Sequence, residues 1–595
     1  MLAAVTAIAA LATDYTGTLT VNGTSSQATV TVTNDGGNYT VVINNISSIG
    51  NIEITAPGTT SNGLTSVITS QDINAGNANL VLVFNQYAMA FNLDIVSDQI
   101  NTNVKFAQDG ELTGYQIKNS GFENFKGNGE PLAWHGFKSA TGKWAAMAPG
   151  SLASSTDCHS GSKSVVMTSG SLFGVVGNGT MTTGRLNAGS TTANDPDNCS
   201  RMDISDTNTD ANDDPYYTVM HGRPDGITFW AKFVPKSTSY RASMSAIITD
   251  GTYYQDPENT TYTNKLATAK DINNIASCDW TEFSVPFNYI DNNITGQALL
   301  VTFSTNSTPG GGQGGDKLYI DDVSLVYNAA ITGISVKGVA LESFSQDVHE
   351  YNCKIAGKIT DADIDATYVS PHAYLVKKAI ETEDGYKLIV AVVSNDFNTV
   401  KMYTINVTIT LDGVTFDEGR QWATWYGDQD LALPENVTAS VVDAINGNNV
   451  SISSVDYLPA NVGVLLHSTT AASEITTTPY SGTTQSVSSL LMGSTKSSQI
   501  SNAYVLYNNQ FILGQDGTTL AAHRCYLPVE GDVTNAPRML MIGNDQGTVT
   551  AIDDLTTSGR RIEAVYNAQG QRVNENATGI LIIRYSDGTT TKVIR

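Results

Sequence analysis

The chain has 595 residues, a formal net charge of −25, 41 % hydrophobic residues and only 15 % charged residues. At ~150 residues per domain this length suggests about four domains, and the wealth of Ser, Thr, Asn and Gly is typical of all-β domains with many turns. No cluster of Lys and Arg offers the basic face that nucleic acids need, which excludes a nucleic-acid partner.

The first twelve residues form an apolar run that ends in small residues. This pattern resembles the hydrophobic region and cleavage site of a signal peptide without its charged start, and it predicts a secreted or cell-surface protein. An apolar first strand is the alternative. The run is too short to cross a bilayer, and no other stretch is long and apolar enough for a transmembrane helix.

The five cysteines lie far apart and none forms a C-x-x-C pair, so neither a zinc ribbon nor thioredoxin chemistry is expected. We expect buried free thiols. A disulfide between two of Cys158, Cys199 and Cys278 is the alternative.

Residues 13–110 alternate between apolar and polar positions, as in 28–33 (ATVTVT), and residues 34–38 (NDGGN) are typical of a hairpin turn. The pattern predicts a small β-meander or β-barrel. The opening 15–21 (YTGTLTV) resembles calycin-like β-barrel domains at the N-termini of secreted proteins from Gram-negative gut anaerobes. We expect a structural role for this domain, with ligand binding as the alternative.

Residues 119–328 form the largest expected unit, with the segments 120–124 (SGFEN), 131–135 (PLAWH), 161–167 (GSKSVVM) and 319–325 (YIDDVSL). Together these segments resemble jelly-roll carbohydrate-binding modules. Three others resemble the carbohydrate metabolism domain, a family of conjectured function in gut-bacterial surface proteins: 172–185 (LFGVVGNGTMTTGR), 223–233 (RPDGITFWAKF) and 281–287 (TEFSVPF). The resemblances imply a β-sandwich that binds carbohydrate.

Residues 329–411 begin with 331–351 (ITGISVKGVALESFSQDVHEY) and end with 400–409 (VKMYTINVTI). These segments resemble a cadherin-like or immunoglobulin-like sandwich. Such a module implies a spacer between functional domains.

Two further β-domains are expected at the C-terminus. Residues 412–548, with 458–466 (LPANVGVLL) and 522–528 (AHRCYLP), resemble a β-domain of gut-bacterial surface proteins of unknown function. Residues 549–595, with 565–573 (VYNAQGQRV), are similar to the type A sorting domain of type IX secretion, which implies outer-membrane export machinery as a partner. A terminal β-module without a sorting role is the alternative.

The segment 317–327 has the composition of a strand, yet Asp321 and Asp322 are adjacent in its middle. Alternation places one carboxylate among apolar neighbours unless a β-bulge re-aims the pair, and a buried carboxylate needs a cation or several donors. In jelly-roll modules a glutamate of the opening segment and the first aspartate of the closing strand bind a structural calcium. The resemblance implies Ca²⁺ held by Glu123, Asp321 and the Gly121 carbonyl; hydrogen bonds to backbone amides are the alternative.

Sugar recognition needs aromatic rings that stack on pyranose faces and polar groups that fix hydroxyls. Alternation along 228–233 and 280–285 places Trp230 and Trp280 on an outer sheet face beside polar neighbours. Packing of these rings under loops or a second layer is the alternative. The expected ligand-binding residues are Trp230, Trp280, Tyr253, Tyr254 and Trp134.

No catalytic residues are expected, because H-E-x-x-H, G-x-S-x-G and Walker motifs are absent and no carboxylate pair stands out. The acidic segment 194–215 is expected to be a solvated loop, and the glycine-rich segment 310–315 a flexible tip. The sequence therefore favours a secreted glycan-binding protein that does not catalyse a reaction. The alternatives are a glycan-degrading hydrolase on the same domain and a structural adhesin or filament component.

Overall fold

The structure is a computed structural model of the chain. It describes residues 12–543 and 562–594, apart from short gaps at residues 48, 62–63, 86–89, 109–113, 173, 530, 532, 568, 575–576, 578–579 and 586–589. The expected signal-peptide segment 1–12 lies outside the described residues except for its last residue. The chain divides into two compact units, one of Met1–Asp412 with Thr476–Ser481 and one of Gly413–Ile475 with Gly482–Arg595.

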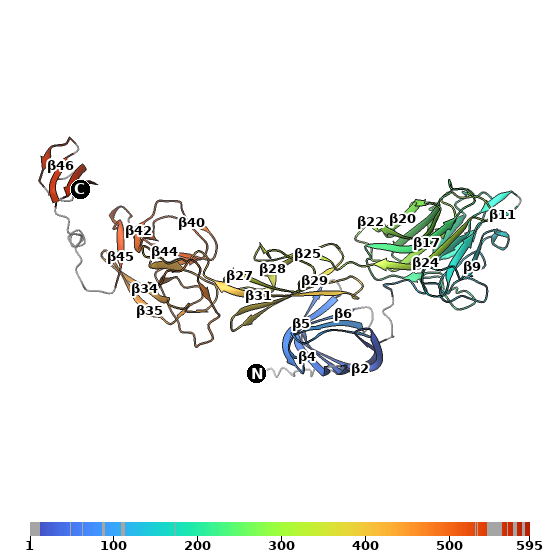
Figure 1. The fold of residues 1–595 in the computed structure, drawn as a ribbon, viewed down its shortest axis with the longest axis horizontal. Helices are drawn as coiled ribbons and strands as arrows, with labels where there is room; N and C mark the ends of the chain where they lie inside the picture. The colour runs from blue at the N-terminus through green and yellow to red at the C-terminus, as the bar shows by residue number, and fades with distance from the viewer. Residues whose placement is uncertain are drawn as a thin grey trace, which may run out of the picture. The chain divides into compact units, whose positions relative to one another are not determined.

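Almost every regular element is a β-strand, which confirms the predicted all-β fold class (Figure 1). The helices of the described residues are three-residue 3-10 turns, namely η1 (Ala145–Met147), η2 (Asp361–Asp363) and η3 (Val533–Asn535). None of the helices in the described ranges is long and apolar enough to cross a membrane.

The first eight strands form a closed antiparallel barrel (Figure 1): β1 (Ala12–Val21), β2 (Thr24–Asp35), β3 (Asn38–Ile46), β4 (Gly50–Ser61), β5 (Leu64–Ile73), β6 (Gly76–Asn85), β7 (Ala90–Val96) and β8 (Asn101–Ala107). Closure is made by β1, which pairs with both β2 and β8. The sequence was compatible with either a meander or a barrel, and the structure shows a barrel. Because side chains alternate along a strand, one residue in two enters an apolar cluster that includes Val30, Ile43, Leu82 and Phe106.

A β-sandwich follows in the same unit. Its five-stranded sheet contains, in spatial order, β21 (Cys278–Pro286), β17 (Gly226–Val234), β24 (Lys317–Val326), β10 (Ser164–Thr168) and β9 (Ser151–Ser155). Its six-stranded sheet contains β13 (Thr180–Thr182), β23 (Ala298–Ser304), β18 (Ala242–Thr249), β20 (Lys265–Ile275) and β22 (Asn288–Tyr289), with β16 (Thr218–Val219) on β23. The buried core between them contains Phe229 and Ile320 from the first sheet and Met244 and Val301 from the second.

The outer face of the six-stranded sheet is partly covered by a small sheet of β14 (Arg185–Ala188), β15 (Asn198–Met202) and β19 (Tyr254–Asp256). Met202 and Tyr254 of this small sheet pack on Ile247, Ala298 and Leu300. These three residues alternate with core residues along β18 and β23. A hairpin of β11 (Gly170–Leu172) and β12 (Val175–Gly177) is separate from both sheets.

Two more sheets complete the first unit. One contains β26 (Val339–Ala340), β25 (Ile331–Val336) and β28 (Ile364–Tyr368), and the other contains β27 (Glu350–Ala356), β31 (Val400–Thr410), β30 (Gly385–Val393) and β29 (Tyr374–Thr382), with β38 (Thr476–Thr477) on β31. The strands β27 and β31 run parallel, whereas β30 and β31 run antiparallel. The cadherin-like or immunoglobulin-like assignment of this region stays a prediction.

The second unit contains a nine-stranded sheet of β32 (Trp422–Trp425), β37 (Val464–His467), β34 (Thr438–Asn446), β35 (Asn449–Val455), β45 (Met539–Ile542), β42 (Gln510–Leu513), β41 (Ala503–Tyr507), β44 (Arg524–Pro528) and β39 (Met492–Ser494). Its shorter pairs are β33 (Leu431–Ala432) with β36 (Tyr457–Leu458), and β40 (Ser498–Ile500) with β43 (Thr518–Leu520). A four-stranded sheet is formed by β47 (Arg572–Val573), β46 (Ile562–Asn567), β48 (Ile580–Tyr585) and β49 (Thr590–Ile594).

Candidate functional site

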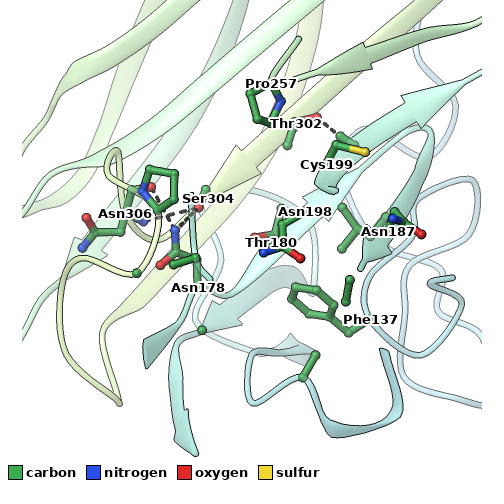
Figure 2. Close-up of a pocket in the computed structure, with 18 of the residues that line it drawn as sticks. Phe137, Asn178, Thr180, Asn187, Asn198, Cys199, Pro257, Thr302, Ser304 and Asn306 are labelled. Carbon is green, nitrogen blue, oxygen red and sulfur yellow. Dashed lines mark hydrogen bonds between the residues drawn. The ribbon is translucent and has the colours of Figure 1, made fainter. Parts of the chain in front are cut away.

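A pocket with a volume of about 710 Å³ opens on the outer face of the six-stranded sheet (Figure 2). Its floor comes from β13, β23, β18 and β20, and its walls come from β14, β15, the β11–β12 hairpin and nearby loops. The volume falls within the ~300–1,000 Å³ that is typical of small-molecule sites.

Hydroxyl side chains in register form the floor of the pocket. Ser304 of β23 pairs with Thr180 of β13 on one side and with Ser243 of β18 on the other. Thr302, two residues before Ser304 on the same strand, pairs with Ser245. The residues between them along each strand face the sandwich core, so alternation turns these hydroxyls outward. Cross-strand neighbours on one face lie ~4.5–5.5 Å apart, so the strands present a regular grid of hydroxyl groups.

Neighbouring polar groups orient several of these hydroxyls. Thr302 Oγ1 donates to Ser200 Oγ at 2.9 Å, and Ser245 Oγ donates to Asp256 Oδ2 at 2.7 Å. Asp256 in turn forms an ion pair with Lys270, with 3.0 Å between Oδ1 and Nζ. The second row of the floor is therefore fixed by groups from β15, β19 and β20.

Asn178 stands between the β11–β12 hairpin and the floor. Its amide donates to Ser304 Oγ at 3.2 Å and to the carbonyl of Asn306 at 3.3 Å, and Figure 2 shows both bonds. The side chain therefore ties the residue that follows β12 to the end of β23.

One wall of the pocket is apolar. The hairpin contributes Leu172, Val175 and Val176, and η1 and the segment that follows it contribute Met147 and Pro149. Two aromatic side chains, Phe137 and Trp144, also line the pocket. The site therefore combines apolar and aromatic surface with hydroxyl groups.

Two facing glycines let the hairpin sit directly on Pro149. Gly170 and Gly177 pair across the hairpin. A Cβ atom on Gly177 would lie 2.6 Å from Pro149 Cγ, and one on Gly170 would lie 1.9 Å from the Pro149 carbonyl oxygen. Both distances are shorter than real Cβ contacts, so the position of the apolar wall depends on these two residues having no side chain.

Charge and nucleophiles are scarce in the pocket. Among the described lining residues, Asp256 is the one carboxylate, and Lys270 is the one cationic side chain. Cys199 also lines the pocket as a free thiol. Burial raises the pKa of the Cys199 thiol to about 11, so it stays protonated at neutral pH.

The predicted ligand-binding residues Trp230 and Trp280 lie on the five-stranded sheet, away from the pocket lining. Both are half-buried and both contact His159. The imidazole of His159 is stacked on Trp230 with ring centroids 3.6 Å apart, and Trp280 Nε1 donates to Asp157 Oδ1 at 3.0 Å. Tyr319 completes this group, with its centroid 6.3 Å from that of Trp280. The sequence placed both tryptophans on an outer face, and the structure brings them together there.

Two of the other predicted aromatic ligands are core residues. Trp134 and Tyr254 are both 0 % exposed. Trp134 packs between Phe122 and Phe303, and Tyr254 packs between the small sheet and the six-stranded sheet. Neither ring has a face that a sugar can reach, which corrects the expectation for both. Tyr253 is 39 % exposed, and its role stays a prediction.

A β-bulge resolves the conflict in the closing strand. The register between β17 and β24 shifts between Thr228 and Trp230, which pair with Ser324 and Asp321. Asp322, in the bulge, has φ of 47°. The shift lets residues on both sides of the bulge face the core: Leu318, Ile320, Val323 and Leu325.

The predicted calcium ligands Glu123 and Asp321 hold the loop that joins β9 to β10. Asp321 is fully buried, and its Oδ2 accepts the backbone N–H groups of His159 at 2.9 Å and Ser160 at 3.2 Å. Glu123 Oε1 accepts the N–H groups of Ser162 at 2.9 Å and Lys163 at 3.3 Å. These are the backbone hydrogen bonds that the sequence analysis gave as the alternative to calcium.

Several carboxylates lie close to the same loop. Burial, followed by the carboxylates of Asp321, Glu123, Asp157 and Asp322, raises the pKa of Cys158. These hard oxygen donors suit Ca²⁺. However, no group of three His, Cys, Asp or Glu side chains within the described ranges is arranged to hold a metal ion. Carbonyl oxygens such as that of Gly121 would have to complete any shell, and the calcium site stays a prediction.

No protein-family model and no curated protein matches the chain. A solved structure from Bacteroides thetaiotaomicron, provisionally described as a glycoside hydrolase, has 15 % identity and a TM-score of 0.26 over 46 % of this chain and 86 % of that one. Another from Bacteroides vulgatus, with the same provisional description, has 14 % identity and a TM-score of 0.22 over 44 % and 97 %.

A third solved structure comes from work on the promiscuous specificity of carbohydrate-binding modules of the β-sandwich superfamily. It has 12 % identity and a TM-score of 0.19 over 52 % of this chain and 96 % of that one. All three TM-scores are below 0.5, so these similarities carry no argument about fold or function.

The sequence analysis did not predict the pocket, although the segment 172–185 contains part of its lining. Residues 172–185 supply the hairpin part of the apolar wall together with Asn178 and Thr180. The glycine-rich segment 310–315, expected to be a flexible tip, contributes Gly310 to the lining. Its Gly315 N–H also donates to the Ser169 carbonyl at 2.8 Å. The usable signal was the alternation of Thr180 with the apolar Met181, which indicates that Thr180 faces away from the core, whereas Thr182 is fully buried.

Proposed function

We propose that the chain is a secreted or cell-surface protein that binds a glycan without catalysis, in the pocket on the six-stranded sheet. The observation that carries the proposal is the grid of hydroxyl groups from Thr180, Ser304, Ser243, Thr302 and Ser245 beside aromatic rings. A hydroxyl both donates and accepts a hydrogen bond, which suits the hydroxyl groups of a sugar. The rings of Phe137 and Trp144 offer apolar faces for the C–H surface of a pyranose.

The charges in the pocket favour binding over hydrolysis. Glycosidases use two carboxyl groups roughly 5–9.5 Å apart. Asp256 is the one carboxylate among the described lining residues, and it is engaged by Lys270 and Ser245. A hydrolase built on this domain remains the alternative, and it would need a second acid from outside the described lining.

Calcium forms part of the proposal. Glu123 and Asp321, with the carbonyl of Gly121, would hold the ion where the opening and closing segments of the sandwich meet the loop from β9 to β10. A bound Ca²⁺ would stabilise the folded sandwich by mass action. The N-terminal barrel, the residues 329–411 and the C-terminal modules would display the sandwich, and the export machinery would recognise residues 549–595. A structural adhesin is the second alternative.

A glycan array probed with the full chain tests the function. We expect binding that Trp144→Ala and Ser304→Ala weaken at least tenfold. Trp230→Ala and Trp280→Ala are the matched variants on the other sheet, and we expect them to leave binding unchanged. Loss of binding in these two variants alone would move the site to the five-stranded sheet. Release of reducing ends would favour the hydrolase, and an array without binding together with self-association of the chain would favour the adhesin.

A further inference from the structure

The apolar wall and the hydroxyl floor of the pocket are continuous along the chain. Val176 ends the apolar wall, and Asn178 two residues later donates to Ser304 of the floor at 3.2 Å. Thr180, two residues further, is itself in the floor and pairs with Ser304. A ligand group on this side of the pocket therefore contacts methyl groups and hydroxyl groups within a few residues.

The apolar wall is held in one position. Pro149 packs against the facing pair Gly170 and Gly177, and the Gly315 N–H donates to the Ser169 carbonyl at 2.8 Å at the base of the hairpin. Leu172 and Val175 pair across the hairpin. The wall is thus a fixed apolar surface against which an apolar group of a ligand can pack.

The pocket also disfavours a charged ligand. Its one described carboxylate, on Asp256, is paired with its one described cation, on Lys270. An anionic sugar would have to displace Asp256 from Lys270, and a cationic ligand would have to displace Lys270. The ligand that leaves this pair intact is neutral.

We propose that the pocket selects a neutral sugar that carries an acetamido group, with the acetyl methyl against Val176. The proposal rests on the proposed function and adds the substrate class. The amide N–H and C=O need a hydrogen-bond acceptor and a donor, which the hydroxyls of Thr180 and Ser304 can supply. A plain hexose would instead bring a hydroxyl against the apolar wall, where it loses its water without gaining a partner.

Matched pairs of glycans test the proposal on the full chain. The probes are oligosaccharides of N-acetylglucosamine and N-acetylgalactosamine, each compared with the glucose or galactose oligosaccharide of the same linkage. One methyl-sized group in an apolar pocket changes affinity by roughly 10–200-fold, so we expect the N-acetylated member to bind at least tenfold tighter. Val176→Thr replaces a methyl group by a hydroxyl at constant shape, and we expect it to reduce this preference severalfold.

The control variant is Val219→Thr, which changes an exposed valine of β16 outside the pocket lining. We expect it to keep the full preference. Equal or tighter binding of the hexose members would overturn the acetamido inference and leave glycan binding in place. Binding of no glycan at all would overturn the proposed function itself. A preference that survives in Val176→Thr would place the acetyl group away from the hairpin and overturn the assigned contact.

Discussion

The carboxylate of Asp321 accepts the backbone N–H of His159 at 2.9 Å, across 162 residues of sequence. This bond joins the closing strand of the sandwich to the loop that leads into β10. Glu123 of the opening segment holds the same loop through the N–H of Ser162 at 2.9 Å. Gly161 makes this approach possible, because a Cβ atom there would lie 2.0 Å from Glu123 Oε1. Two carboxylates thus bind one loop from the two ends of the domain.

Substitution of Asp321 tests both roles of this carboxylate. Asp321→Asn keeps the shape but places an NH₂ donor where backbone N–H groups need an acceptor, which costs about 1–3 kcal/mol for an unsatisfied buried group. We expect a lower melting temperature of the sandwich in calorimetry of the full chain. If Ca²⁺ binds here, EDTA lowers the melting temperature of the unsubstituted chain, and the variant no longer responds. An unsubstituted chain that melts identically in EDTA and in Ca²⁺ rules out the metal. The control is Asp213→Asn at an exposed position. Its neighbours Asp210 and Asp214 pair with the buried Lys126, which corrects the expectation that the whole segment 194–215 is a solvated loop.

Acidification is expected to destabilise the sandwich through His135. This side chain is fully buried against Tyr216, and burial followed by the charge of Lys126 lowers its pKa from 6.5 to about 4. The unfolded chain therefore takes up a proton between pH 6.5 and 4 that the folded sandwich does not, so stability falls as pH falls through this window. The shift corresponds to about 3 kcal/mol.

The variant His135→Phe keeps a ring on Tyr216 and removes the proton-binding site. Calorimetry of the full chain at pH 7.5 and pH 4.5 should show a smaller loss of sandwich stability in the variant than in the unsubstituted chain. His467→Phe, in the second unit, is the control and should leave that loss unchanged. Equal losses in His135→Phe and the unsubstituted chain would contradict the assignment.

Neutralising Asp94 should stabilise the barrel at neutral pH. Burial raises the pKa of Asp94 from 3.8 to about 6, against a hydrogen bond from Asn103 and the charges of Lys105 and Lys401. The folded state therefore holds this proton more tightly than the unfolded state, and stability falls as pH rises from 3.8 to 6. Asp94→Asn removes this cost, so we expect a gain of about 1–3 kcal/mol at pH 7 and almost none at pH 4. A gain of the same size at both pH values would point to another cause.

The sequence predicts the orientation of residues in regular strands because the alternation of side chains is local. It therefore placed Trp230 and Trp280 on an outer face. It also offered a bulge as one solution for Asp321 and Asp322, and the register shift in β24 is that solution. It could not place Trp134, whose ring is covered by Phe303 from a strand far along the chain.

The pocket depends even more on distant parts of the chain. Thr180, Ser304 and Ser243 lie in three strands whose register is set by the core of the sandwich, and no local pattern specifies which residues become neighbours. The wall depends on the approach of Pro149 to Gly170 and Gly177.

The substitution Gly177→Ala should reduce glycan affinity while leaving the sandwich folded. The new methyl group would lie 2.6 Å from Pro149 Cγ, so the hairpin has to move away from Pro149 and carry Val176 with it. Overpacking of this kind would cost about 1–3 kcal/mol of folding stability, and movement of the hairpin relieves it at the expense of the Val176 contact with the sugar. Loss of about 1.4 kcal/mol of contact energy corresponds to tenfold in affinity. We therefore expect at least a tenfold weaker titration with the best glycan of the array. The matched control is Gly127→Ala in the same sandwich, where a Cβ atom meets nothing within 4 Å. Unchanged affinity in Gly177→Ala would show that the hairpin does not contact the bound sugar.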